Sequence, residues 1–353
     1  MSLKVVSVVG ARPQLIKAAV VSEAIRKHCS EVLVHTGQHY DYEMSDIFFA
    51  DLELPSVDHH LGIGSGSHGW QTGSMLIALE EVLIMETPQW VLVYGDTNST
   101  LAGALAASKM RIPLAHVEAG LRSYNRAMPE EINRIVADRF SKILFCPSHS
   151  SVRNLEKEGI TNGVHMVGDV MYDAMLHYLP KAKDRPSPLE RIEVAAGAYA
   201  LATIHRAKNT DDPERLAAIM ACLAVVETTV VFPAHPRTRE ALRTNQLAIP
   251  ENVRLLEPVG YLDMLMLEQG ASAILTDSGG VQKEAFWLQV PCVTLRDETE
   301  WVETVETGWN VVVGVDPERV QAAMNRGRPV ESPPPVYGDG KAAGRIAELM
   351  AED

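Results

Sequence analysis

The sequence has few cysteines and lacks any long apolar run. Only four of its 353 residues are cysteine, and these are widely separated along the chain: Cys29, Cys146, Cys222 and Cys292. Such scattered cysteines are typical of buried thiols in a reducing compartment rather than of a disulfide framework. No apolar run approaches the roughly 18 residues that span a membrane, and no signal-peptide cleavage pattern follows the first strand. We therefore predict a cytoplasmic protein without membrane contact.

Basic residues are also in short supply. The chain has 32 Lys and Arg against 46 Asp and Glu, for a formal net charge of −14. Nucleic acid and anionic lipid both require clustered basic residues, so we expect neither as a partner. An anionic small ligand needs only a local group of cations. The candidates for such a group are Arg12, Lys17, Arg134, His205, Arg206 and His235.

Several common nucleotide and metal motifs are missing. There is no phosphate loop of the form G-x-x-x-x-G-K-[ST] and no serine nucleophile elbow. The run from Gly64 to Gly69 matches the G-x-G-x-x-G spacing of dinucleotide sites, but it follows no strong strand, and we expect a mobile loop. Without a nicotinamide site, epimerisation by transient oxidation is excluded. No close group of His, Cys and acidic residues has metal-ligand spacing. We predict no cofactor and no metal.

Two series of short apolar strands, each followed by a helix, are present instead. The first series comprises residues 4–9, 31–36, 90–94, 114–117 and 143–145; the second comprises residues 199–204, 229–232, 253–256, 273–275, 291–295 and 310–313. Alternating strands and helices are typical of doubly wound parallel sheets. The pattern predicts an α/β protein with two Rossmann-like domains and a cleft between them. We place the domains at residues 1–169 and 170–337, with a helix in residues 338–353 packing back on the first domain.

The turn at Ser278-Gly279-Gly280 is the clearest candidate for a phosphate site. It follows an apolar strand and opens a helix, whose first N–H groups and positive dipole end attract anions. Glu284, in the first turns of the same helix, is placed to accept two ribose hydroxyls. The alternative is an ordinary strand-to-helix turn, which is abundant in α/β folds.

Three carboxylates follow strands or open helices in the first domain. Asp96 and Glu118 come directly after strands, and Glu130 lies with Glu131 at the start of a helix that begins with proline. Neighbouring carboxylates repel each other, so we expect one of the three to hold its proton near neutrality, as an acid–base pair requires. The alternatives are an N-cap role for Asp96 and a helix-dipole role for the paired acids.

The candidate cations also follow strands. Arg12 and Lys17 lie after the first strand, where a surface salt bridge is the alternative. His205-Arg206 and His235 follow the first two strands of the second domain. Two histidines beside arginines at consecutive strand ends favour anion binding, although a single histidine is more often a core or capping residue.

Taken in order, seven short motifs give the sequence a family resemblance. They are Gly10-Ala11-Arg12-Pro13-Gln14, His35-Thr36-Gly37-Gln38-His39, Gly95-Asp96-Thr97, His116-Val117-Glu118-Ala119-Gly120, Pro129-Glu130-Glu131, His205-Arg206 and Asp277-Ser278-Gly279-Gly280. Together they resemble the non-hydrolysing UDP-N-acetylglucosamine 2-epimerases over nearly the whole chain. The resemblance implies a GT-B fold, a homodimer, and a reaction on a UDP-sugar without a redox cofactor.

In that reaction UDP leaves C1 of the sugar as the C2 proton is lost, and both return with the proton on the opposite face. The resemblance implies that Asp96, Glu118 and Glu130 form the acid–base set, with His205 near the diphosphate. It assigns uracil binding to the turn Gly260-Tyr261. The residues that it assigns to phosphate and ribose binding are Arg12, Lys17, Ser278, Gly279, Gly280 and Glu284.

The chain departs from the family pattern at three places. Gln14 stands where many members carry glutamate, Trp301 where arginine is frequent, and Tyr40-Asp41-Tyr42-Glu43-Met44 replaces a shorter segment associated with allosteric substrate binding in bacterial enzymes. These features resemble the branch that epimerises UDP-2,3-diacetamido-2,3-dideoxyglucuronate. UDP-GlcNAc remains our first expectation and this uronate the second. A GT-B glycosyltransferase and a non-enzymatic sugar-nucleotide sensor are the alternatives from other classes.

Overall fold

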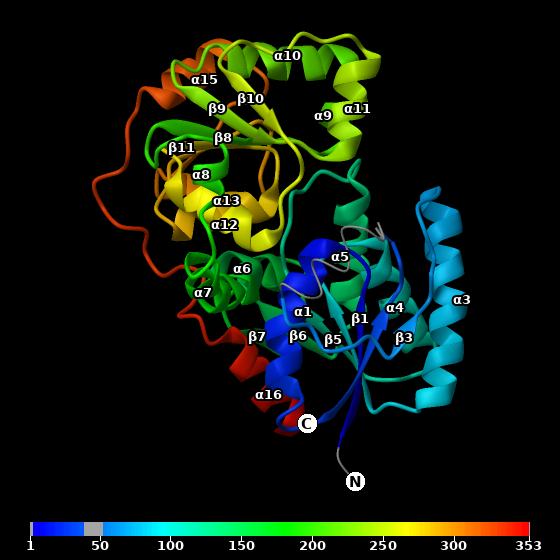
Figure 1. The fold of residues 1–353 in the computed structure, drawn as a ribbon. Helices are drawn as coiled ribbons and strands as arrows, with labels where there is room; N and C mark the ends of the chain where they lie inside the picture. The colour runs from blue at the N-terminus through cyan, green and yellow to red at the C-terminus, as the bar shows by residue number, and fades with distance from the viewer. Residues whose placement is uncertain (1–2, 39–51, 353) are drawn as a thin grey trace. The chain divides into compact units, whose positions relative to one another are not determined.

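The computed structural model describes residues 3–38 and 52–352. His39 of the second motif and the divergent segment 40–44 lie outside the described residues. The chain divides into two compact units, and each contains a parallel sheet with helices on both faces (Figure 1). Unit 1 is Met1–His177 with Pro335–Asp353, and unit 2 is Tyr178–Pro334. The predicted α/β architecture with two doubly wound sheets is confirmed. Separate domains with a boundary near residue 169 stay a prediction.

The sheet of unit 1 has seven strands in the order β3-β2-β1-β4-β5-β6-β7. Its strands are β1 (Lys4–Val9), β2 (Ser30–His35), β3 (His59–His60), β4 (Trp90–Tyr94), β5 (Leu114–Val117), β6 (Ile143–Cys146) and β7 (Val164–Met166). Its helices are α1 (Arg12–Ile25), α3 (His68–Glu86), α4 (Asn98–Lys109), α5 (Pro129–Phe140), α6 (His149–Lys157), most of α7 (Val170–Lys183) and α16 (Ala342–Glu352).

The central strands form because their side chains are apolar on both faces. In β1, Val8 pairs with Val34 of β2 and with Val93 of β4, and all three side chains are fully buried. Helices cover both faces of such a sheet, which is why its strands read as continuous apolar runs. The one polar residue of β1 that faces the core, Ser7, donates its hydroxyl proton to Glu31 at 2.6 Å. Because the strands are parallel, their carboxyl ends lie at one edge of the sheet.

Unit 2 repeats this plan with six strands in the order β10-β9-β8-β11-β12-β13. Its strands are β8 (Tyr199–Thr203), β9 (Thr229–Pro233), β10 (Val253–Leu256), β11 (Ala273–Thr276), β12 (Cys292–Thr294) and β13 (Asn310–Val312). Its helices are α8 (Pro188–Arg191), α9 (Ala207–Thr210), α10 (Pro213–Ala224), α11 (Pro236–Thr244), α12 (Tyr261–Gly270), α13 (Gly279–Trp287), α14 (Val302–Glu306) and α15 (Pro317–Met324).

The C-terminal helix α16 packs against α1 of unit 1, as the red and blue helices in Figure 1 show. Its start is fixed by Asp173 of α7, whose carboxylate accepts from the N–H of Ala343 at 2.8 Å. Ile346 and Met350 of α16 are fully buried. Apolar burial and one helix-starting hydrogen bond thus hold this segment on unit 1.

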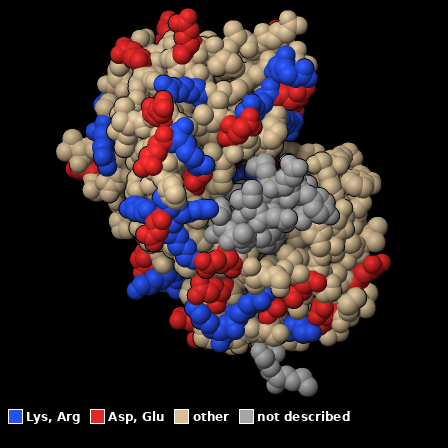
Figure 2. Space-filling view, viewed as in Figure 1, with Lys and Arg blue, Asp and Glu red and all other residues tan. Residues whose placement is uncertain are grey.

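The surface is of mixed charge on the face shown in Figure 2, where acidic and basic side chains alternate without one large patch of either sign. All four cysteines are buried free thiols. Among the described residues, no helix combines the length and apolar character that crossing a bilayer requires.

Candidate active site

A tight turn after β4 places Asp96 at the carboxyl edge of the unit 1 sheet. Gly95 has a φ of 59°, and its N–H donates to the carbonyl oxygen of Val117 at 2.9 Å. Thr97 caps α4, because its hydroxyl accepts from the N–H of Thr100 at 3.4 Å. The N-cap alternative for Asp96 is therefore wrong, and its carboxylate points to another partner.

That partner is Arg134 of α5. The guanidinium donates to Asp96 Oδ2 at 2.5 Å and to Glu131 Oε2 at 2.9 Å, and the arginine side chain is only 5% exposed. The side chain of Asn133 donates to the backbone carbonyl of Asp96 at 2.9 Å. Two consecutive residues of α5 thus fix both the backbone and the side chain of Asp96. Anion binding by Arg134, as expected from the sequence, stays a prediction.

Glu118 lies at the end of β5 beside Lys17. Its backbone adopts a φ of 71°, which non-glycine residues rarely adopt, and its N–H donates to the carbonyl of Phe145 at 3.1 Å. Lys17 Nζ forms an ion pair with the Glu118 carboxylate, and each side chain is 8% exposed. A Cβ added to Gly95 would lie 3.2 Å from Glu118 Oε2. The Gly95 turn, Glu118 and Lys17 therefore meet in one place.

The paired acids at the start of α5 have different surroundings. Glu131 is 1% exposed and accepts from the N–H and hydroxyl of Ser123 and from the N–H of Tyr124, each at 2.9 Å. It therefore holds the preceding loop. Glu130 is half-buried in the first turn of the helix. Glu131 therefore has a structural role, and an acid–base role for Glu130 stays a prediction.

Two of the three predicted carboxylates have cationic partners. Asp96 has Arg134 as its partner and Glu118 has Lys17, so two of the three acids carry a matched cation. A protonated member of the set stays a prediction.

Gln14 links the loop after β1 to the end of β4. Its side-chain oxygen accepts from the N–H groups of Gly10 and Ala11 at 2.8 and 3.0 Å, while its side-chain nitrogen donates to the Tyr94 carbonyl at 2.7 Å. An ionised glutamate has no proton for that carbonyl. The departure from the family pattern at this position is thus accommodated by a neutral amide that both accepts and donates. Arg12 follows this loop at the first position of α1.

In unit 2, Asp277 organises the loop that follows β8. Its fully buried carboxylate accepts from the N–H groups of His205 and Arg206 at 3.1 and 3.0 Å, and from the side chain of Asn209 at 2.9 Å. His205 Nδ1 lies 3.4 Å from the same carboxylate, and its side chain is 50% exposed. The Asp277 carboxylate therefore holds the backbone of this loop, while the His205 imidazole stays accessible to solvent.

The N-terminus of α13 has the features expected of a phosphate site. The hydroxyl of Ser278 accepts from the N–H of Val281 at 3.5 Å. A Cβ at Gly279 would lie 2.9 Å from the indole nitrogen of Trp301, so the protein itself requires glycine there. At Gly280 the nearest atom to such a Cβ is 3.8 Å away, the hydroxyl of Ser278. The backbone at Gly280 is thus open to the close approach of an anion.

Trp301 and Lys283 support this helix from the side. The ammonium of Lys283 lies 3.8 Å from the centroid of the Trp301 ring, and both side chains are buried. A cation over a desolvated indole is worth roughly 2 kcal/mol. The tryptophan that replaces the family's frequent arginine therefore packs against both the turn and the first turns of α13.

Helices α12 and α13 contain a group of buried polar side chains. Glu284 is 4% exposed and Glu268 of α12 is fully buried. Burial, and then the charge of Glu284, raises the pKa of Glu268 well above its ordinary value. Tyr261 is also buried, and its ring packs edge-on against Tyr178 at 6.0 Å. A uracil contact from the Gly260-Tyr261 turn would therefore come from the backbone, because the tyrosine ring belongs to the core.

His235 caps α11, since its Nδ1 accepts from the N–H of Arg237 at 3.2 Å. The capping alternative weighed for this histidine is therefore observed, and its anion binding stays a prediction. Sequence reasoning missed the anchoring roles of Asp277, Glu131 and Asn133. A signal existed for Asp277, which directly follows a strand as Asp96 does.

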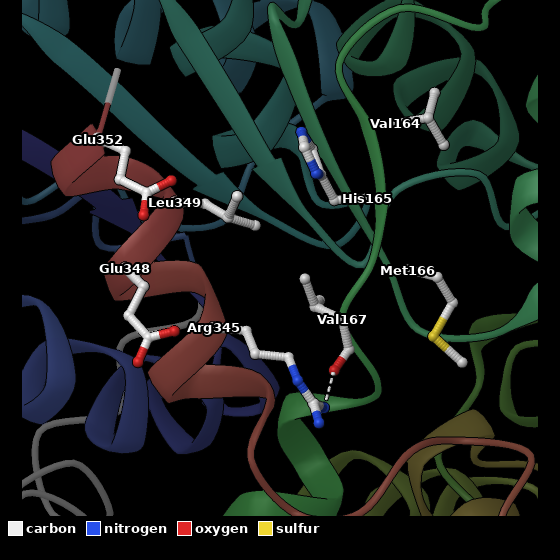
Figure 3. A pocket seen from close by; sticks show the side chains of 8 residues that line it. All are labelled: Val164, His165, Met166, Val167, Arg345, Glu348, Leu349 and Glu352. Carbon is white, nitrogen blue, oxygen red and sulfur yellow. Dashed lines mark hydrogen bonds between the residues drawn. The ribbon is translucent and has the colours of Figure 1, made fainter.

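A surface pocket in unit 1 is lined by residues of β7 and α16 (Figure 3). Arg345 lines it and donates to the Val167 carbonyl at 2.9 Å. None of the predicted site residues lines this pocket. Within residues 3–38 and 52–352, no group of three or more His, Cys, Asp and Glu side chains is arranged to hold a metal ion.

Comparisons with known proteins identify similar chains over the full length. A family model described as UDP-N-acetylglucosamine 2-epimerase matches residues 23–351. A UDP-N-acetylglucosamine 2-epimerase homolog of Methanococcus maripaludis is 51% identical, with 99% of each chain covered. The UDP-2,3-diacetamido-2,3-dideoxy-D-glucuronate 2-epimerase of Pseudomonas aeruginosa is 49% identical, covering 99% of this chain and 100% of that one.

Among solved structures, the UDP-GlcNAc 2-epimerase of Methanocaldococcus jannaschii in complex with UDP-GlcNAc and UDP is similar, with a TM-score of 0.92 at 43% identity and 100% of both chains covered.

Proposed function

Because the chain belongs to the UDP-N-acetylglucosamine 2-epimerase family, we propose that it is an isomerase that interconverts UDP-GlcNAc and UDP-ManNAc. The observation in this molecule that carries the proposal is that Glu118 and its partner Lys17 lie against the Gly95 turn, which is followed directly by Asp96. Carboxylates with matched cations at one sheet edge are suited to moving a proton to and from carbon. The N-terminus of α13 is suited to a diphosphate.

The chemistry requires the leaving group to move first. A C2 proton beside an unactivated acetal is hardly acidic, so the C1–O bond loosens and UDP departs with the bonding electrons. The oxocarbenium character at C1 makes the C2 proton acidic, and a carboxylate accepts it, leaving a C1–C2 double bond. UDP then returns to C1 while a proton reaches C2 from the opposite face. Stabilised diphosphate charge contributes several kcal/mol, and placed carboxylates add about 10²–10⁴-fold.

The proposed roles divide between the two units. Asp96, Glu118 and Glu130 in unit 1 exchange protons with the sugar. In unit 2 the open backbone at Gly280 and the half-exposed ring of His205 support diphosphate binding, and the buried carboxylate of Glu284 supports ribose binding.

Proton NMR of UDP-GlcNAc in D₂O tests the proposal. Deuterium should appear at C2 of both epimers, and Glu118→Gln should remove this exchange. Transfer of sugar to an added acceptor without C2 exchange would favour the glycosyltransferase alternative. Tight UDP-sugar binding without exchange or transfer would favour a sensor.

UDP-2,3-diacetamido-2,3-dideoxyglucuronate is the second candidate substrate. The 49% identity to the P. aeruginosa enzyme of that name, over 99% of this chain, favours it. The same NMR measurement with each UDP-sugar separates the two. Faster C2 exchange with the uronate under matched conditions would replace UDP-GlcNAc as the substrate.

We also propose a homodimer, as the family resemblance implies, formed by the outer layer of unit 1. Helix α3 exposes Trp70, Ile77 and Ile84 at intervals of seven residues, which places them on one helical face. Helix α3 packs on α4 and α4 on α5, which exposes Ile132 and Phe140. Exposed apolar residues grouped in this way are typical of interfaces.

Light scattering should give twice the chain mass for the wild type and a monomer for the double variant Ile77→Asp, Ile84→Asp. Ile249→Asp, at an exposed isoleucine of unit 2, is the matched control. A monomeric wild type would refute the dimer.

The four buried thiols support the cytoplasm as the compartment. We propose that the product is a precursor of cell-surface polysaccharide.

A further inference from the structure

His116 of β5 is a fully buried histidine whose two ring nitrogens both face oxygen atoms. Nδ1 lies 2.8 Å from Asp138 Oδ1 on α5, and Nε2 lies 2.7 Å from the carbonyl oxygen of Gly95. Both distances are those of short hydrogen bonds. The side chain therefore connects α5 to the turn that carries Asp96.

Asp138 is the centre of this connection. Besides His116, its carboxylate accepts from the N–H of Gly120 at 3.1 Å and from Arg122 at 2.7 Å. Burial alone would raise the pKa of Asp138, but the hydrogen bond and charge of His116, with the charge of Arg122, outweigh it and leave the pKa below its ordinary value. The buried ion pair with Arg122, at 2.7 Å, independently identifies Asp138 as an anion, which accepts three hydrogen bonds and has no proton to donate to His116.

A neutral imidazole has one donor nitrogen and one acceptor nitrogen. A backbone carbonyl can only accept, and so can an ionised Asp138. With a neutral ring, one of the two contacts at 2.7–2.8 Å would bring two lone pairs together. Only the imidazolium, which donates from both nitrogens, satisfies both contacts.

The charges around His116 also balance. Arg122 forms a two-pronged pair with Glu158, at 2.7 and 2.8 Å, in addition to its bond to Asp138. With both ring nitrogens of His116 protonated, two cations, His116 and Arg122, match two anions, Asp138 and Glu158. Burial raises the pKa of the nearby Cys146 thiol, which is therefore neutral. A buried charged group is tolerated when it is paired and hydrogen-bonded in this way.

We propose that His116 donates hydrogen bonds from both ring nitrogens and acts as a positioning residue, holding the Gly95 carbonyl against Asp138 and so fixing Asp96 relative to Glu118. The Gly95 turn is held by this bond on one side and by its N–H bond to Val117 on the other. Asp138 belongs to the same helix as Asn133 and Arg134, which hold Asp96. His116 lies on β5, two residues before Glu118, which directly follows this strand. The inference rests on the proposed function, because it assigns His116 to the geometry of that acid–base set.

The charge of the ring can be measured without any activity. In ¹⁵N-labelled protein at about pH 8, where a free imidazole is neutral, both ring nitrogens of His116 should carry protons, with the signals assigned by their loss in His116→Gln. A ring with one protonated nitrogen overturns the proposal. If wild-type protein exchanges no C2 proton with either UDP-sugar, the proposed function fails, while this measurement still decides the charge of His116.

Two variants test the positioning role, because asparagine places its amide near Nδ1 and glutamine near Nε2. His116→Gln keeps a donor for the Gly95 carbonyl, and His116→Asn keeps one for Asp138 only. We expect His116→Asn to slow C2 exchange about a hundredfold, the scale of a misplacement near 1 Å, with little change in KM. His116→Gln should lose clearly less, and His165→Gln on β7 is the histidine control.

Equal rates for the two His116 variants, or losses that only follow their thermal stability, would show a merely structural role and overturn the assignment. If His116→Asn does not fold, Asp138→Asn replaces it. That change leaves His116 without its anion, so it should allow the ring to lose a proton at about pH 8. Both ring nitrogens remaining protonated in that variant would contradict the proposed pairing.

Discussion

Replacing Lys17 by methionine would remove the cation beside Glu118 while keeping most of the apolar stem. Neither side chain of this pair is more than 8% exposed. A lysine lost from such a site leaves a carboxylate that is buried and unpaired, which is far more costly than the loss of a surface ion pair. The perturbation therefore tests whether Lys17 belongs to the acid–base set or only to the phosphate ligands.

The expected change in the free energy of unfolding follows from the burial of this ion pair. Breaking a buried pair costs about 3–5 kcal/mol, and the retained stem places Lys17→Met at the lower end, near about 3 kcal/mol. Glu118→Gln should cost about 1 kcal/mol, because the amide oxygen still accepts from the ammonium. The double variant removes both charges and should cost about 2 kcal/mol, about 2 kcal/mol less than the sum of the single changes.

Urea unfolding of the wild type and the three variants at neutral pH measures this coupling energy, and calorimetry with UDP measures binding in parallel. Costs that add without coupling, together with a large loss of UDP affinity in Lys17→Met alone, would refute the pairing. That result would instead assign Lys17 to binding the diphosphate.

Three further outcomes are expected. Glu118→Gln should bind UDP as the wild type does in calorimetry yet incorporate no deuterium at C2; normal turnover would show that the base is misassigned. Glu284→Ala should weaken UDP binding by about tenfold or more, whereas Glu268→Gln, which replaces a buried neutral acid by an amide, should change the affinity little at neutral pH. Asp138 has a lowered pKa in the folded protein, so its contribution to stability is complete above the unfolded pKa of about 3.9 and is lost as the pH falls through the folded value. Urea midpoints measured from neutral to acid pH should therefore fall less steeply for Asp138→Asn.

Most of the fold could be predicted from the sequence because the central strands are apolar on both faces. Continuous runs such as those in β1 and β4 are typical of buried parallel strands, and their predicted positions are confirmed. The two strands that were missed are short or half-buried: β3 has two residues and β7 has three. Edge strands of this kind owe their conformation to a neighbouring strand rather than to their own side chains.

The site could be predicted only in part. Position after a strand was enough to single out Asp96, Glu118 and the Ser278 turn, because parallel strands bring their carboxyl ends to one edge. It could not say which cation meets which acid. The Lys17–Glu118 pair joins residues 101 positions apart, and the Asp277 bond to His205 spans 72. Tertiary packing determines which of these residues meet, and the periodicity of a single sequence does not predict such long-range pairs.

The pairing of charges also explains how an acidic chain can serve an anionic substrate. In unit 1, Arg134 contacts Asp96 and Glu131, and Lys17 contacts Glu118. These cations already compensate carboxylates, so they add little net attraction for a diphosphate. In unit 2, the α13 N-terminus offers backbone N–H groups at Gly280, which carry no ionic charge and need no counterion. Nucleotide affinity should therefore depend chiefly on the geometry of α13, and the net charge of −14 says little about it.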